Sequence, residues 1–212
     1  TLSLTVKISA GGEQTVYYLI CAAEDYAEVS RLNRMITGHG VEYFIMRTDN
    51  YWRAWVNKEG RDLSALPENI ISLYKKSLLI LRTNIDSTGA IIAWNYSDVQ
   101  HFARDTYSYM WPRDGALTAY ALDMAGYHGT TRHFFDFCLD IISKGKESVG
   151  YFLHKYNPDG SLGSSWHPWT TDGKKILPIQ EDGTALILWA LWHHFDKFRD
   201  IEFTARQYES LV

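Results

Sequence analysis

Apolar residues recur at helical spacing through most of the sequence after residue 66, and this pattern limits the fold more than any other feature. Spacing of three and four residues places apolar side chains on one face of a helix. The segments that show it are 67–82, 111–126, 131–144, 183–195 and 200–212. Gly126 ends one of these segments and Gly145 follows another, as is typical of helix C-caps. The chain is therefore predicted to be mainly α-helical.

The first residues have a different pattern. Residues 1–10 alternate apolar and polar side chains, and residues 15–22 are rich in β-branched and aromatic side chains, with Gly11 and Gly12 between them. This pattern predicts a β-hairpin. Because a lone hairpin is marginally stable in water, we expect these to be the last two strands of a larger sheet, so that the chain is a fragment of a longer protein.

Two helices are expected between this hairpin and the main helical region. Apolar spacing predicts them at residues 24–37 and 41–56, and Gly38 and Gly40 separate the two. Residues 58–65 are polar and are interpreted as a linker. We therefore place a domain boundary between residues 65 and 66, with one domain at 1–65 and a second at 66–212.

Charge and hydropathy exclude several classes of partner. Lys and Arg number 21 against 25 Asp and Glu, a formal net charge of −4. Nucleic-acid binding needs clustered positive charge, so we expect no nucleic-acid partner. No stretch approaches the ~20 apolar residues that span a bilayer, so we expect no membrane partner. The start of the chain lacks the pattern of a signal peptide, but without an initiator Met this leaves the compartment open.

Metal ligands and cofactor motifs are not indicated. Cys21 and Cys138 lack the spacing of zinc sites and are interpreted as free thiols. The adjacent His193 and His194 cannot both face one ion from a helix. No Gly-rich phosphate loop is present. We therefore expect neither a metal nor a cofactor.

Two of the predicted helices begin alike, with acidic residues followed by glycine. Arg113 and Asp114 open one, and Gln180, Glu181 and Asp182 precede Gly183 at the other. An acidic residue in a first turn complements the helix dipole, which is worth ~0.5–1 kcal/mol and needs no further role. Alternatively, these side chains bind a ligand. Sequence spacing alone leaves both explanations open.

Aromatic residues surround both helix starts. Tyr107, Tyr109 and Trp111 precede the first, and Trp166 and Trp169 precede the second. Aromatic residues make up 15% of the chain, with 8 Trp and 14 Tyr, more than core filling usually requires. Polar groups among aromatic faces suit a sugar, whose hydroxyls form hydrogen bonds while its C–H faces pack on rings. The pattern favours a carbohydrate site.

Three segments read TYSYMWPRDGAL at 106–117, GYFLHKYNPDGSLGSSWHPW at 150–169 and LPIQEDGTALILWALW at 177–192. Together they resemble glycoside hydrolase family 15, the glucoamylases with their glucodextranase and trehalase relatives. The resemblance implies that residues 66–212 are the first part of an (α/α)6 barrel catalytic domain. It likewise implies that residues 1–65 contain the end of an N-terminal β-sandwich and linking helices.

The resemblance implies an inverting hydrolase that releases glucose from the non-reducing ends of α-glucans. A trehalase of the same family and a non-catalytic sugar-binding protein are the alternatives. Its partner would be an oligosaccharide or polysaccharide of α-linked glucose, and the rest of the polypeptide would complete the barrel. The family's general acid lies in a Trp-Glu-Glu segment that does not occur here. The acid and base are therefore expected beyond Val212, and the 212-residue chain alone is expected to be inactive.

The same resemblance assigns substrate-binding residues. Arg113 and Asp114 would hold the hydroxyls of the innermost glucose, Tyr107 would face its ring carbon, and Trp111 would shape the subsite. The remaining residues implied near the substrate are Trp166, Trp169, Gln180, Glu181 and Asp182. Trp166 would correspond to the tryptophan that steadies the catalytic acid, with Trp169 as the alternative because of the insertion at 167–175.

Overall fold

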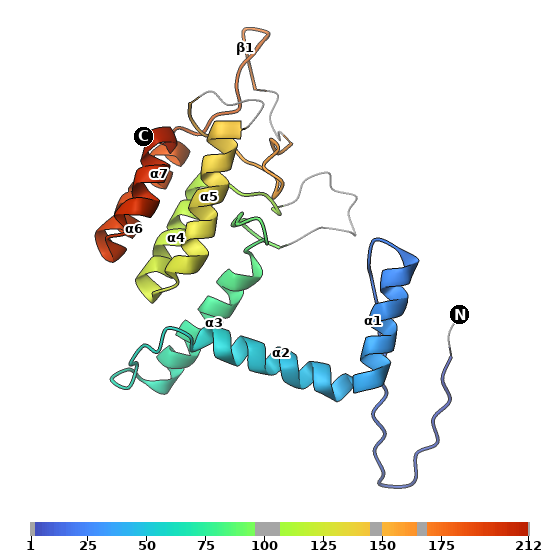
Figure 1. The fold of residues 1–212 in the computed structure, drawn as a ribbon. Helices are drawn as coiled ribbons and strands as arrows, with labels where there is room; N and C mark the ends of the chain where they lie inside the picture. The colour runs from blue at the N-terminus through green and yellow to red at the C-terminus, as the bar shows by residue number, and fades with distance from the viewer. Residues whose placement is uncertain (1–2, 96–106, 145–149, 165–168, 212) are drawn as a thin grey trace. The chain divides into compact units, whose positions relative to one another are not determined.

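The computed structural model describes residues 3–95, 107–144, 150–164 and 169–211 (Figure 1). Within these residues the chain forms helices α1 to α7 and one two-stranded sheet, so the prediction of a mainly helical protein is confirmed. The chain divides into two compact units, 1–55 and 56–212. Each unit is described by itself. This division lies before the boundary predicted between residues 65 and 66.

The first unit contains the two predicted helices. Helix α1 spans Tyr26–His39 and α2 spans Val41–Val56, whose last residue belongs to the second unit. The side chain of Asp25 accepts a hydrogen bond from the backbone N–H of Glu28 and so caps the start of α1. Gly40 ends α1 with φ 84°, a conformation that glycine adopts without strain. Local capping therefore sets the limits of α1.

The predicted β-hairpin is not formed. Residues 3–22 contain no strand, and their turn is held by a hydrogen bond from the backbone N–H of Gly12 to the carbonyl of Ser9. The apolar side chains that alternate along the segment, such as Ile8 and Ile20, are exposed. A strand pair needs a further layer on which to bury its apolar face. Alternation alone is insufficient here because no other described residues cover these side chains.

The second unit contains the other helices and a short sheet. These elements are α3 (Glu68–Thr83), α4 (Pro112–Ala125), α5 (His128–Lys144), β1 (Thr170–Thr171), β2 (Lys174–Lys175), α6 (Glu181–Phe198) and α7 (Ile201–Leu211). All five helices predicted after residue 66 are present. Helix α5 begins at His128 rather than at residue 131, and Pro67 is the N-cap of α3 rather than its first residue.

Helices α4 and α6 pack side by side and run parallel, as Figure 1 shows. Arg113 in the first turn of α4 contacts Asp182 in the first turn of α6. Asp123 near the end of α4 contacts His194 near the end of α6. The starts of the two helices therefore lie next to each other at one end of the unit, and their C-terminal parts also lie next to each other.

Helices α5 and α7 form the second layer. Helix α5 packs against α4 and α7, and α7 also packs against α6. Arg132 near the start of α5 pairs with Asp200, which precedes α7, and Asp136 pairs with Arg206 further along. The unit is thus two neighbouring αα-hairpins, α4–α5 and α6–α7. An (α/α)6 barrel would contain such hairpins, and closure into a ring stays a prediction.

A buried polar cluster joins three of these helices. Asp123, Thr131 and His194 are each at most 1% exposed. The carboxylate of Asp123 accepts a hydrogen bond from the Thr131 hydroxyl and lies 2.9 Å from His194 Nδ1. An ionised carboxylate only accepts hydrogen bonds, so Nδ1 of His194 carries the proton. This cluster ties α4, α5 and α6 together inside the hydrophobic core.

Two glycines allow the helices to approach closely. A Cβ atom at Gly115 of α4 would lie 2.6 Å from the ring of Phe134 on α5. A Cβ atom at Gly183 of α6 would lie 3.1 Å from Cβ of Pro112 on α4. Both glycines are buried. The missing side chain of Gly183 lets the start of α6 approach that of α4, and the missing side chain of Gly115 lets α4 approach α5.

Candidate functional site

The first turns of α4 and α6 bring three of the predicted residues together. The guanidinium of Arg113 donates from Nη1 to Oδ2 of Asp182 at 3.2 Å and from Nη2 to Oδ2 of Asp114 at 3.4 Å. The three side chains are 38%, 46% and 43% exposed, respectively. One guanidinium therefore lies between two carboxylates on an accessible surface.

Neither helix start is capped by a side chain. The N-cap residues are Trp111 for α4 and Gln180 for α6, and neither side chain forms a capping hydrogen bond. Asp114 and Asp182 bond Arg113 instead, although both still lie where the helix dipole favours negative charge. The dipole explanation accounts for their charge but not for their convergence on Arg113.

An aromatic group adjoins the start of α4. Trp111 is 5% exposed, and its ring centroid lies 5.9 Å from those of Tyr107 and Tyr109. The Tyr107 ring is tilted by 33° to the indole, and Tyr107 is 52% exposed. A buried indole thus supports an accessible phenol ring within a few residues of Arg113 along the chain.

Two residues that the sequence analysis did not single out complete this group. The indole N–H of Trp111 donates to Nε2 of His154 at 3.1 Å. The ammonium of Lys155 lies 4.5 Å from the ring centroid of Tyr109 and 5.1 Å from that of Trp111, and Lys155 is 1% exposed. They are the two adjacent basic residues of the segment GYFLHKYNPDG, and no spacing pattern in that segment marks them as site residues.

Trp169 joins the group through His154. Their ring centroids lie 5.4 Å apart, and Trp169 has φ 46°, which is uncommon for a bulky residue. The residue immediately precedes β1, and Asp172 and Gly173, both with positive φ, connect β1 to β2. Asp-Gly is a strong signal for such a two-residue turn, and the sequence analysis did not use it. Trp166 lies outside the described residues.

The other two predicted residues, Gln180 and Glu181, form no hydrogen bond or ion pair with Arg113. The Oε1 atom of Gln180 is buried and has no hydrogen-bond partner among the residues that the structure describes. Glu181 is exposed in the first turn of α6, and within the described part of the chain it has no hydrogen bond or ion pair. The structure therefore unites Arg113, Asp114 and Asp182 but leaves Glu181 outside that contact.

The charge at these helix starts selects against anionic ligands. Three carboxylates, from Asp114, Glu181 and Asp182, accompany one guanidinium in the two first turns. Such a surface repels phosphate or carboxylate groups, whereas it can accept hydrogen bonds from neutral hydroxyls. It would also favour positive charge that develops on a bound molecule.

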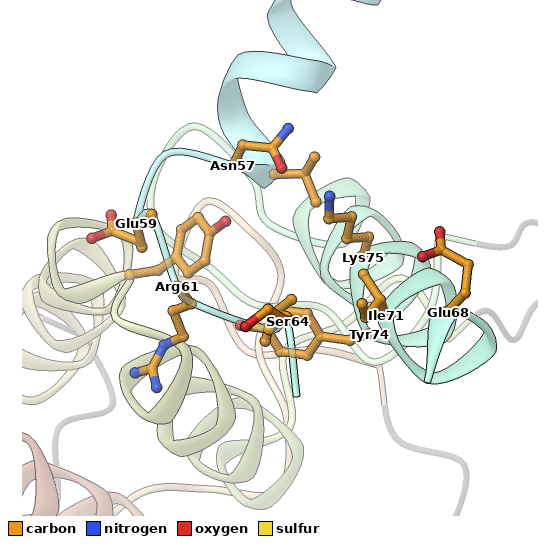
Figure 2. A pocket seen from close by; sticks show the side chains of 12 residues that line it. Asn57, Glu59, Arg61, Ser64, Glu68, Ile71, Tyr74 and Lys75 are labelled. Atoms are coloured by element: carbon orange, nitrogen blue, oxygen red, sulfur yellow. The ribbon is translucent and has the colours of Figure 1, made fainter. Parts of the chain in front are cut away.

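A pocket of about 440 Å³ lies at the other end of α4 (Figure 2). Its lining comes from the segment after α2, from α3 and from Tyr127. Arg61 extends from this segment and donates to the backbone carbonyls of Met124 and Ala125, in the last turn of α4. Because this guanidinium caps a helix C-terminus, we interpret the contact as structural. Helix α4 has 14 residues, so its ends are separated by about 20 Å.

No described helix combines the length and the apolar character required to cross a membrane. Within the same described residues, no three His, Cys, Asp or Glu side chains gather in a way that would hold a metal ion.

Comparisons with known proteins identify one relevant relative. An uncharacterized glycosyl hydrolase of Methanocaldococcus jannaschii is 28% identical to this chain over 165 residues. The aligned region covers 76% of this chain and 23% of that protein, so the chain spans about a quarter of the length of the curated relative it matches. No protein-family profile and no solved structure matches the chain.

Proposed function

We propose that this chain is the sugar-binding part of a glycoside hydrolase that removes glucose from the ends of α-glucans. The observation that carries the proposal is the position of Arg113, held between Asp114 and Asp182 at the adjacent starts of two parallel helices. The distant relative named as a glycosyl hydrolase supports the general class. The finer assignment, a glucoamylase-like enzyme, rests on the motifs around these residues.

The proposed binding chemistry follows from the side chains. A sugar hydroxyl both donates and accepts hydrogen bonds, so it can donate to Asp114 or Asp182 while accepting from Arg113. The existing contacts of Arg113 with both carboxylates hold the three groups in place before a ligand binds. The C–H face of the sugar would pack against Tyr107, which is accessible beside Trp111.

The proposed reaction is hydrolysis with inversion. One carboxylic acid protonates the leaving oxygen while a carboxylate activates water on the opposite face of the sugar. We assign neither role to residues 1–212 and propose that both groups lie elsewhere in the polypeptide. The carboxylates at the starts of α4 and α6 would stabilise the positive charge that develops on the sugar ring.

Assays of the longer polypeptide that contains this chain test the proposal. Purified protein is incubated with maltotriose or trehalose, and the released glucose is measured. We expect release from maltotriose and none from trehalose. Release from trehalose alone would identify a trehalase, whereas binding of maltotriose without hydrolysis would identify a sugar-binding protein. Absence of both binding and hydrolysis would contradict the proposal.

The residue assignment is tested separately on the 212-residue chain. Binding of maltose is followed by titration calorimetry in the unaltered chain and in an Arg113→Gln variant. We expect the substitution to weaken binding, because the variant has no guanidinium to donate to a hydroxyl. Equal affinity in the two proteins would show that the sugar binds elsewhere.

A further inference from the structure

The segment 152–156 connects the two loops that lead into α4 and α6. Met110 and Tyr156 exchange two backbone hydrogen bonds, each 2.9 Å long. Two residues earlier, the backbone N–H of His154 donates to the carbonyl of Pro178. Met110 stands just before α4, and Pro178 stands just before α6. His154 therefore lies between the chain segments that carry Arg113 and Asp182.

The His154 side chain contacts two of the predicted sugar-binding tryptophans. Its Nε2 atom accepts the indole N–H of Trp111, and its ring packs against that of Trp169. Both members of the hydrogen bond are buried, Trp111 at 5% exposure and His154 at 8%. The indole N–H can only donate, so Nε2 must be the unprotonated nitrogen and the imidazole must be neutral with its proton on Nδ1. The structure thus specifies one tautomer.

We propose that His154 is a positioning residue that fixes the plane of the Trp111 indole for sugar binding. This inference rests on the proposed function, because Trp111 is predicted to shape the innermost sugar subsite. Trp111 is also the N-cap of α4, so the orientation of its ring is tied to the helix that carries Arg113 and Asp114. An indole that rotates away from His154 would withdraw support from Tyr107, which packs beside it.

The hydrogen bond adds a directional contact to the packing of the Trp111 indole. Its ring meets Tyr109 and His154 edge to face, at interplanar angles of 82° and 80°. Rotation of the indole away from His154 would break this hydrogen bond inside a buried environment, which is costly. His154 Nε2 supplies the acceptor, so one orientation is favoured over the others.

Two variants separate the hydrogen bond from the ring. His154→Phe keeps an aromatic ring but removes the acceptor, whereas His154→Gln removes the ring and keeps an oxygen close to the position of Nε2. In the 212-residue chain, solvent exchange of the Trp111 indole N–H is measured by NMR. We expect exchange about tenfold faster in His154→Phe, with rescue toward the unaltered rate in His154→Gln. Equal exchange in all three proteins, or equal acceleration in both variants, would overturn the proposal.

A measurement on the unaltered chain keeps the proposal testable even if a variant fails to fold. The 15N chemical shifts of the His154 ring in the unaltered chain report which nitrogen is protonated. We expect an unprotonated Nε2 coupled to the Trp111 indole N–H. A protonated Nε2 would overturn the proposal whatever the variants do.

Measurements of maltose binding distinguish this inference from the proposed function. Maltose binding is measured for the same three proteins, with His193→Gln as a control on α6 whose ring contacts Tyr120 and Trp189 rather than Trp111. We expect about a tenfold loss of affinity in His154→Phe, recovery in His154→Gln and little change in His193→Gln. If the unaltered chain binds no maltose but the exchange results hold, His154 still positions Trp111 and the sugar-binding function fails. Equal maltose affinity in His154→Phe and the unaltered chain would overturn the link to sugar binding.

Discussion

Arg113 donates a hydrogen bond to Asp182 across the starts of two parallel helices, with 3.2 Å between Nη1 and Oδ2. The two residues are 69 positions apart in the sequence. Because both side chains are more than a third exposed, a pair of this kind contributes less than about 1 kcal/mol to folding. Stability alone therefore gives a weak reason for this contact, whereas the proposed sugar binding gives a specific one.

In the proposed hydrolase, Asp114→Ala is expected to reduce kcat/KM by about ten- to a hundredfold, because a hydrogen bond from a sugar hydroxyl to a charged carboxylate is worth ~1.5–3 kcal/mol. Initial rates on maltotriose measure the effect. Asp49→Ala is the matched control, since Asp49 also forms an exposed ion pair with an arginine, Arg53 of α2. A loss of similar size in both variants would point to a general effect on folding.

Asp123→Ala is expected to lower the free energy of unfolding of the 212-residue chain by about 3 kcal/mol. The substitution removes the acceptor of two buried donors, the Thr131 hydroxyl and the Nδ1–H of His194. Urea denaturation followed by circular dichroism measures the change. Asp196→Ala, which breaks an exposed ion pair with Arg199, should cost less than about 1 kcal/mol. Equal losses in the two variants would show that the buried cluster contributes no more to stability than an exposed ion pair does.

Gly115→Ala is expected to destabilise the second unit by about 1–3 kcal/mol, because the new Cβ would lie 2.6 Å from the rigid ring of Phe134. Thermal unfolding of the variant measures this. Gly129→Ala in α5 is the control, since a Cβ there meets no atom within 4 Å. The control should be neutral or more stable, because alanine favours a helix by up to about 1 kcal/mol over glycine. A stable Gly115→Ala variant would contradict the close packing of α4 on α5.

Tyr127 should make stability fall with pH in the alkaline range. Burial, aided by nearby Tyr74 and Glu59, raises its pKa from 10.0 to about 12. Between these values the unfolded chain releases the phenolic proton and the folded chain keeps it, so unfolding becomes easier as pH rises. The loss should be on the order of 2 kcal/mol between pH 10 and 12. The free energy of unfolding, measured by urea denaturation at several pH values in this range, should fall less steeply with pH in Tyr127→Phe than in the unaltered chain. Equal pH dependence in the two proteins would contradict this assignment.

The two cysteines should differ in reactivity. Cys138 is buried, and burial raises the pKa of its thiol well above the usual value, so little thiolate forms near neutral pH. Cys21 is only partly buried. A disulfide reagent at pH 8 should therefore modify Cys21 rapidly and Cys138 only after the protein is unfolded. Rapid modification of Cys138 in the Cys21→Ser variant would disprove the buried position.

Helix positions were largely predictable because their signals are local. Apolar spacing and the glycines at positions 40 and 126 locate α1 and α4 to within about two residues. The prediction of a hairpin was wrong for residues 3–22, because alternation shows only that a strand would have an apolar face. Whether that face is buried depends on other parts of the structure.

The candidate site was predictable only in part. Arg113, Asp114 and Asp182 were selected by their place at helix starts beside aromatic residues, but His154 has no such local signal. Its importance comes from the Nε2 contact with Trp111, which is 43 positions away in the sequence. Sequence spacing within a helix or strand does not report a contact of that range.

Sequence alone therefore determined where the helices after residue 66 form and which residue types stand at the candidate site. Tertiary structure decided that α4 and α6 run parallel, that Arg113 meets Asp182 rather than Glu181, and that the Trp111 indole N–H meets His154 Nε2. The physical reason is that helix formation depends on neighbours three and four residues away, whereas the site depends on which helix faces pack together. That packing is set by close contacts such as Gly183 against Pro112, which exist only in the folded chain.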